Sequence, residues 1–146
     1  MRTAAASIAV VGEVMLDVLV APGSEAHAAE VVVRAGGTVV NAALAAAAAG
    51  ADTTAVGRVG RDAAAAAVGG ALAGAGVADA LATDERERTG TFVRVEETIH
   101  VDRGANRRLR PDDLRRLDAD AVLVSGYALL HDDTRAAERV SSCRSA

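Results

Sequence analysis

The sequence predicts an α/β layered fold with a mostly parallel sheet. Short apolar runs of strand length alternate along the chain with longer Ala-rich runs of helical length, and glycines separate them. The first run, Ser7 to Val11, ends at Gly12 and is apolar after its first residue. A continuous apolar run of this length is typical of a strand that is buried on both faces of a parallel sheet.

The first two predicted helices are recognised by the residues at their ends. The run from Thr38 to Ala49 consists almost entirely of Ala, Val and Leu, with Thr38 placed to cap its first turn and Gly50 to end it. The run from Arg61 to Ala73 predicts a second helix. Strands are expected before and between these helices, at 31–33 and 53–56.

The alternation of strand and helix breaks near residue 89. Thr89 to Val95 and Thr98 to Val101 alternate polar and apolar residues and are separated by Glu96 and Glu97. This pattern predicts a hairpin with one solvated face, a flap beside the main sheet. Beyond it we expect a helix that opens at Pro111, a buried strand at 121–124 and a last helix at 132–140.

Composition and charge exclude several kinds of chemistry. All 16 basic residues are arginine, so the chain supplies neither a Schiff-base lysine nor the phosphate-binding lysine of a P-loop. The net charge of −4 lacks the basic footprint of a nucleic-acid-binding protein, and we expect no nucleic-acid partner. A core rich in Ala buries little apolar surface per residue, which predicts a small margin of stability.

Cysteine and histidine show no pattern typical of a metal site. Cys143 is the only cysteine, which rules out an internal disulfide and fits a reducing compartment. No metal-ligand spacing links the three histidines, which are expected on the surface: His27, His100 and His131. Glu13 and Asp17 interrupt the apolar run 8–20, so we expect a cytoplasmic protein with no membrane partner.

Four motifs occur in the order found in the ribokinase-like (PfkB-type) carbohydrate kinases. They are Gly12-Glu13-Val14-Met15-Leu16-Asp17, Gly36 to Ala43 followed by Gly50 and Gly60, Val56 to Asp62, and Thr89-Gly90-Thr91 followed by Arg103 to Asn106. The chain resembles this family up to about Val140. The resemblance implies a ribokinase-like αβα layered fold with a small β flap (lid), incomplete at the C-terminus. Residues 1–146 would then be the N-terminal portion of one domain, with flap strands near 18–34 and 89–101.

Several residues form a candidate sugar site. Gly36 and Gly37 let backbone approach a ligand closely, and the helix that follows points free N–H groups toward it. Asp17 offers two acceptors and Asn41 offers a donor and an acceptor, as a hydroxyl-rich ligand requires. In the family, the positions that match Asp17, Gly37 and Asn41 contact the sugar. Tyr127 follows a predicted strand at the side where open α/β sheets bind ligands, and we expect it to line the pocket.

Some of these residues have a second interpretation. Asp17 is either a sugar ligand or a solvated acid at a strand end. Asn41 lies in an apolar helical run, where burying an unpartnered amide costs roughly 2–7 kcal/mol, and this favours a ligand role. Arg103 is interpreted as a solvated flap arginine rather than a contact for an anionic substrate group. Val39 and Val40 stand where the family prefers small residues, which predicts a crowded or displaced pocket.

Two motifs of the family do not occur in the sequence. One is the Asn-x-x-Glu motif for phosphate and magnesium, and the other is the Asp-Thr-x-Gly-Ala-Gly-Asp motif that carries the catalytic base and the anion hole. The resemblance implies ATP and Mg²⁺ as cofactors, but their binding motifs are absent, so no catalytic or cofactor-binding residue is assigned. After Val140 the periodicity ends, as expected of a prematurely stopped tail.

The expected function is that of an ATP-dependent sugar kinase of which this chain keeps the sugar-binding part and lacks the ATP-binding and catalytic half. The chain alone is then expected to be inactive. The alternative is a non-catalytic module that binds a sugar or nucleoside, or one half of a split kinase. The expected partners are a small-molecule sugar and either a second copy of the chain or a separately encoded C-terminal half. A dinucleotide-binding domain is disfavoured because no Gly-x-Gly-x-x-Gly follows the first strand.

Overall fold

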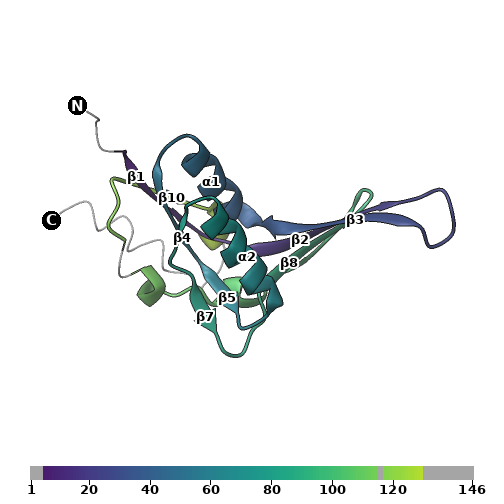
Figure 1. Ribbon diagram of the computed structural model, residues 1–146. Coiled ribbons are helices and arrows are strands. Elements are labelled where there is room, and N and C mark those ends of the chain that lie inside the picture. The colour runs from purple at the N-terminus through teal and green to yellow at the C-terminus, as the bar shows by residue number, and fades with distance from the viewer. Residues whose placement is uncertain (1–4, 115–116, 130–146) are drawn as a thin grey trace.

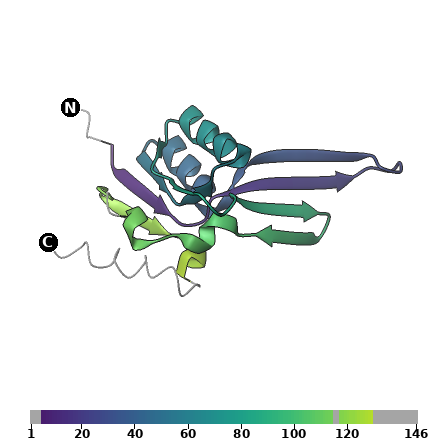
Figure 2. The same cartoon turned by 90° about the horizontal axis from the view of Figure 1, so that it is seen from below.

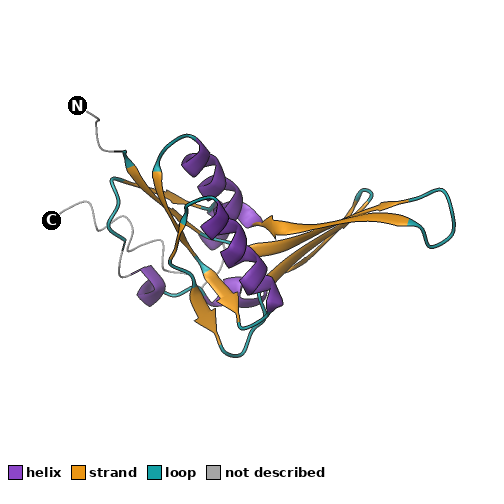
Figure 3. Cartoon of the chain, viewed as in Figure 1, coloured by secondary structure: helices purple, strands orange, loops and turns teal. Residues whose placement is uncertain are grey.

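The structure is a computed structural model that describes residues 5–114 and 117–129 (Figure 1). Its strands form two sheets of four and one small pair, and two helices pack on one of the larger sheets (Figure 3). The strands are β1 (Ser7–Val11), β2 (Met15–Pro22), β3 (Ala29–Gly36), β4 (Asp52–Val56), β5 (Arg58–Gly60), β6 (Ala78–Asp79), β7 (Ala82–Asp84), β8 (Gly90–Val95), β9 (Thr98–Asp102) and β10 (Ala121–Val124). The helices are α1 (Gly37–Ala48) and α2 (Ala63–Gly74), with the short 3₁₀ helices η1 (Gly104–Arg108), η2 (Pro111–Leu114) and η3 (Gly126–Leu129).

The core sheet has the strand order β10-β1-β4-β6, and all of its pairs are parallel. This confirms the predicted α/β fold with a parallel sheet. Val10 and Val11 face opposite sides of β1: Val10 packs in the cluster under α1 and α2, and Val11 packs in a second cluster with Leu109 and Leu114. Because both faces are covered, β1 reads as an unbroken apolar run.

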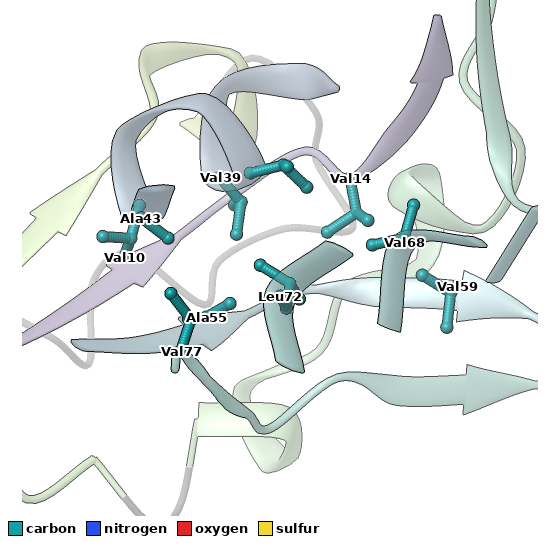
Figure 4. Close-up of a cluster of buried hydrophobic side chains, with 10 residues drawn as sticks. Val10, Val14, Val39, Ala43, Ala55, Val59, Val68, Leu72 and Val77 are labelled. Atoms are coloured by element: carbon teal, nitrogen blue, oxygen red, sulfur yellow. The ribbon is translucent and has the colours of Figure 1, made fainter. Parts of the chain in front are cut away.

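The main core is built from small side chains. Its buried members are mostly valine and alanine, with Leu72 the largest (Figure 4): Val10, Val14, Val39, Val40, Ala43, Ala55, Val59, Val68, Leu72 and Val77. No aromatic side chain belongs to this cluster. Burying each of these side chains therefore contributes less free energy to folding than burying a Leu or Phe would. This agrees with the small margin of stability that the composition predicts.

The second four-stranded sheet, called the lid from here on, projects away from the core sheet (Figure 1). Its strand order is β3-β2-β8-β9. β2 pairs antiparallel with β3 and parallel with β8, and β8 pairs antiparallel with β9. The last pair is the hairpin that the alternating residues of 89–101 predict. The chain therefore crosses between core and lid four times, at the ends of these strands.

Three details differ from the sequence prediction. Thr38 is not the N-cap of α1: the helix begins at Gly37, Gly36 is the N-cap, and the backbone oxygen of Glu13 accepts from Val39 N instead. The helix predicted at Pro111 is a single 3₁₀ turn. The strand 121–124 is not buried, since Leu123 is 48% exposed. The helix predicted at 132–140 lies outside the described residues.

Asp62 caps α2, as its position before the helix predicts. Its carboxylate accepts from Ala65 N (2.9 Å) and from both the N–H (2.8 Å) and the hydroxyl (2.7 Å) of Thr89. Burial alone would raise the pKa of Asp62, but the hydrogen bonds from Thr89 and Ala65 outweigh it and lower the pKa. The same carboxylate thereby ties α2 to the residue that precedes β8.

A buried ionic network joins the small sheet to the 3₁₀ turns. Arg58 Nε lies 2.9 Å from Asp84 Oδ2, and Arg58 Nη1 lies 2.9 Å from both carboxylate oxygens of Asp113. Arg108 Nε lies 3.0 Å from Asp84 Oδ2. Asp84 is almost fully buried. The network connects β5, β7, η1 and η2, which are far apart in the sequence.

Among the described residues, no helix is long and apolar enough to cross a membrane.

Candidate binding site at the root of the lid

The root of the lid is a place of very close backbone packing. Gly37 has φ +83°, and a Cβ there would lie 2.6 Å from the backbone oxygen of Glu13 and 3.0 Å from Met15 N. Any side chain at this position would overlap the segment that links β1 to β2. The glycine pair at 36–37 thus brings the start of α1 directly against the first crossing from core to lid.

Asp17 lies on β2 immediately above this glycine pair. A Cβ on Gly36 would lie 2.2 Å from Asp17 Cγ, so the carboxylate covers the Gly36 backbone. Asp17 is only 7% exposed, and its neighbour across the strand pair, Arg34, places Nε 3.6 Å from Asp17 Oδ2. The alternative interpretation of Asp17 as a solvated strand-end acid is therefore wrong. Burial raises the pKa of Asp17, and the Arg34 guanidinium opposes that rise without cancelling it.

This arrangement predicts that Asp17→Asn stabilises the protein at neutral pH. A carboxyl group whose pKa is raised on folding binds its proton more readily in the folded state, so its ionisation lowers stability as the pH rises through the folded-state pKa. Asn carries no such charge. Urea unfolding at pH 4 and pH 7 should show an advantage of Asp17→Asn over the wild type that grows with pH. An advantage that is absent or shrinks with pH would contradict the prediction.

A cavity of about 520 Å³ lies at the carboxyl ends of β1 and β10. Its lining is mostly apolar and comes from the two strands, from α1 and from the segment after β10: Val10, Val11, Thr38, Ala42, Leu123, Val124, Ser125, Gly126 and Tyr127. Tyr127 is 57% exposed at this cavity. Asp17, Gly36 and Gly37 are not among the lining residues, although Thr38, the next residue, is.

The structure brings three of the five predicted site residues together, Asp17, Gly36 and Gly37. Asn41 lies one turn further along α1 and is exposed, next to Ala42, which lines the cavity. The argument that a buried amide would need a ligand therefore does not apply to Asn41. Its exposure instead leaves the amide accessible beside the cavity.

Val39 and Val40 do not crowd the site. Both side chains are fully buried in the main core, on the side of α1 that faces away from solvent (Figure 4 labels Val39). The prediction that they crowd the pocket is therefore wrong, since neither valine lines the cavity, whereas the cavity does lie apart from Asp17, Gly36 and Gly37. The reason is the helix period: residues 39, 40 and 43 face the core, whereas 38, 41 and 42 are at least partly accessible.

Glu13 and Arg103 form an ion pair that sequence reasoning missed. Arg103 Nη2 contacts Glu13 Oε1 and also donates to the backbone oxygen of Tyr127 at 3.1 Å. Only 15% of the Arg103 side chain and 10% of the Glu13 side chain are exposed, so the interpretation of Arg103 as a solvated flap arginine is wrong. The sequence did contain one indication of this pair: Glu13 is an acid within the apolar run 8–20, and a buried acid needs a partner.

The described residues contain no group of three or more His, Cys, Asp or Glu side chains that would hold a metal ion. Of the predicted surface histidines, His27 and His100 are exposed, and His131 lies outside the described residues. The described acids at the site are engaged in other ways: Asp17 covers Gly36, and Glu13 pairs with Arg103.

The parallel core sheet with helices on it and the projecting lid form a fold of the ribokinase-like class. The sequence matches the pfkB family of carbohydrate kinases over residues 5–146. The chain belongs to this family. A comparison of its sequence with curated proteins gives no match.

Solved structures of similar fold include two fructokinases and a ribokinase. A fructokinase from Xylella fastidiosa with bound ATP superimposes with a TM-score of 0.82 at 20% identity, covering 95% of this chain and 48% of that one. The fructokinase of Halothermothrix orenii gives 0.80 at 20% identity, with 94% and 53% covered. The ribokinase of Giardia lamblia gives 0.74 at 20% identity, with 84% and 45% covered. The chain therefore spans about half the length of these proteins and shares their fold over that half.

Proposed function

We propose that residues 1–146 are the N-terminal, sugar-binding portion of a single ribokinase-like domain, and that a sugar binds at the root of the lid. The observation that carries the proposal is the Asp17 carboxylate, buried directly over Gly36. A carboxylate with acceptor positions left unfilled is suited to a ligand that offers several hydroxyl donors. The structural neighbours are fructokinases and a ribokinase, so a ketohexose or a pentose is the first substrate to test.

Each candidate residue has a distinct role in this proposal. Asp17 accepts hydrogen bonds from neighbouring sugar hydroxyls, since Arg34 at 3.6 Å is too distant to occupy its lone pairs fully. Gly36 and Gly37 let the start of α1 pack closely against Asp17 and the Glu13 backbone. Asn41 offers its exposed amide beside the cavity, and Tyr127 closes the opposite side with an apolar ring that carries a polar tip.

ATP is the proposed phosphoryl donor, with Mg²⁺ as its companion ion. The family membership and the ATP bound to one structural neighbour support this choice. Because the described residues include no ligand set for the metal ion, the phosphate and metal contacts are assigned to residues other than these. The described part of the chain binds and orients the sugar.

Isothermal titration with fructose and ribose tests the sugar proposal. The wild-type chain is expected to bind at least one of them, and Asp17→Ala to weaken that binding by about 10- to 100-fold, because hydrogen bonds to a charged group contribute about 1.5–3 kcal/mol. Asn41→Ala is expected to have a smaller effect in the same direction. Asp52→Ala is the matched control, since Asp52 is an exposed acid on β4 away from the lid. Unchanged affinity in Asp17→Ala would remove Asp17 from the site.

A second candidate function is that of one half of a split kinase. The exposed side chains of Leu123 and Tyr127 favour it, together with the apolar cavity beside them and the edge of β10 that pairs with no described strand. A polypeptide that adds a parallel strand to β10 and packs an apolar helix on Leu123 would cover this surface. ADP release that appears only after such a complementary half is supplied would support the split arrangement, whereas the same mixture without ADP release or association would contradict it.

A further inference from the structure

The lid is attached to the core through a set of buried polar contacts that the proposed sugar site does not use. The chain first crosses to the lid at Gly12 to Val14, and it last returns to the core at Arg103 and η1. Figure 2 shows η1, in green, at the root of the lid beside the ends of β8 and β9. The side chain of Asn106, on η1, bridges these two crossings.

Asn106 uses both ends of its amide on backbone groups. Its Oδ1 accepts from Val14 N at 2.8 Å, and its Nδ2 donates to Val14 O at 2.9 Å and to Arg103 O at 2.9 Å. The residue is only 3% exposed. A buried amide that satisfies three backbone groups of two separate segments fixes their relative position, because breaking any contact leaves a buried polar group unpaired.

The start of β8 is packed against the same amide. A Cβ on Gly90 would lie 2.3 Å from Asn106 Nδ2, 3.0 Å from Arg103 O and 3.1 Å from Val14 O. Glycine at this position therefore lets a third crossing between core and lid lie in contact with the other two. Gly104 likewise packs on the backbone oxygen of Arg88, where a Cβ would lie 2.2 Å away.

The Glu13–Arg103 ion pair extends this junction toward the cavity. Glu13 precedes Val14 and Arg103 is itself held by Asn106, so the pair links the same two crossings through their side chains. Arg103 Nη2 also donates to Tyr127 O, in the segment that lines the cavity. On the other side, Glu13 O accepts from Val39 N in the first turn of α1.

We infer that Asn106 and the Glu13–Arg103 pair are positioning residues that fix the lid on the core and thereby hold Asp17 over Gly36. Val14 directly precedes β2 and Asp17 is the third residue of that strand, so the backbone position at Val14 sets the direction in which β2 leaves the core and the position of the carboxylate. None of the three side chains has to touch the sugar in this arrangement. The effect of these residues on sugar affinity rests on the proposed sugar site. Their effect on the orientation of the lid does not.

The test measures the orientation of the lid directly. Spin labels are attached to cysteines introduced at Glu97, in the turn of the lid, and at Ala48, at the end of α1, in a Cys143→Ser background. Double electron–electron resonance then gives the distribution of lid-to-core distances in the folded protein. Asn106→Asp is the main variant: it keeps the shape of the side chain but places a carboxylate against two backbone oxygens that need a donor.

We expect a narrow distribution for the wild type and a broader one for Asn106→Asp, together with a loss of sugar affinity of roughly 10- to 100-fold from the misplaced Asp17. Val77→Ala is the control for stability alone, because Val77 is a core residue that takes part in none of the polar contacts of the junction described above, and its truncation leaves a cavity. It should lower the melting temperature while leaving the distribution narrow. Arg107→Ala is the control for an exposed neighbour on η1.

If Asn106→Asp does not fold, Arg103→Gln decides, since it removes the ion pair and leaves the Asn106 contacts in place; we expect it to broaden the distribution as well. An unchanged distribution in the folded variant would overturn the inference. A broadened distribution with unchanged sugar affinity would overturn the link to Asp17. If the wild type binds neither fructose nor ribose, the proposed function fails, and the distance distributions still decide whether these residues fix the lid.

Discussion

Asp84→Asn is expected to lower the free energy of unfolding by about 3–5 kcal/mol. Asp84 is 2% exposed and faces both Arg58 and Arg108, so its neutralisation removes the counter-charge that Arg108 faces and leaves Arg58 with Asp113 alone. Since whole domains are stable by about 5–15 kcal/mol and this core is built from small side chains, the loss is a large fraction of the total. Urea unfolding followed by circular dichroism at pH 7 measures it.

Glu85→Gln is the matched control for Asp84→Asn. Glu85 is the next residue along the chain and pairs with Arg61 at 2.7 Å, but both side chains are largely exposed. An exposed pair contributes about 0–1 kcal/mol, so the control should stay close to the wild type. Equal losses in the two variants would show that burial of the network is not the cause.

The same network predicts how stability changes with pH. Burial alone would raise the pKa of Asp84, but hydrogen bonds from the Arg86 and Glu87 backbone and the Arg58 and Arg108 charges hold it well below its usual range. Its contribution is therefore present above the unfolded-state pKa and is lost as the pH falls through the lower, folded-state pKa. The difference in stability between wild type and Asp84→Asn should shrink as the solution is made more acidic.

The 146-residue polypeptide alone is expected to transfer no phosphoryl group to any sugar. A general base and an anion hole each contribute roughly 10² or more to the rate, so the absence of both lowers it by about 10⁴ or more. Neither of two acids is free to act as a base: the sugar hydroxyls would engage Asp17 in the proposed site, and both oxygens of Asp62 accept hydrogen bonds from Ala65 and Thr89. A coupled ADP-release assay with fructose, ribose, acid sugars and nucleosides measures it.

A heat-killed sample and the Asp17→Asn variant are the controls for that assay. Turnover that exceeds the heat-killed sample and disappears in Asp17→Asn would contradict the prediction, because it would require a base within these residues. Turnover that persists in Asp17→Asn would point to a contaminating kinase, which a further purification step removes before the measurement is repeated.

The core of the fold was predictable from the sequence because its signals are local. The strands Ser7–Val11 and Ala121–Val124 have the predicted bounds, since each is a short apolar run with clear ends. β3 is longer than the predicted 31–33, because Ala29 and Glu30 are polar or small and are held in the strand only by their pairing with β2. Such pairing with a neighbouring strand cannot be predicted from the local sequence pattern.

The site was only partly predictable, and the reason is sequence distance. Asp17, Gly36 and Gly37 belong to an ordered set of motifs that together resemble the family. The Glu13–Arg103 pair and the Asn106–Val14 contacts join residues about ninety positions apart, and only the folded chain brings them together. Asn41 was expected to be buried but is exposed. The Ala-rich run around it is apolar on every side and does not reveal which face of α1 is exposed.

In the proposed site a sugar binds beside Gly36, against Asp17. The most direct measurement is a titration of the ¹⁵N-labelled chain with fructose or ribose, followed by amide chemical shifts in two-dimensional NMR. The account predicts saturable shifts at Asp17, Gly36, Gly37 and the first turn of α1, which are lost in Asp17→Ala. No shifts with either sugar, or shifts confined to residues away from the root of the lid, would contradict it.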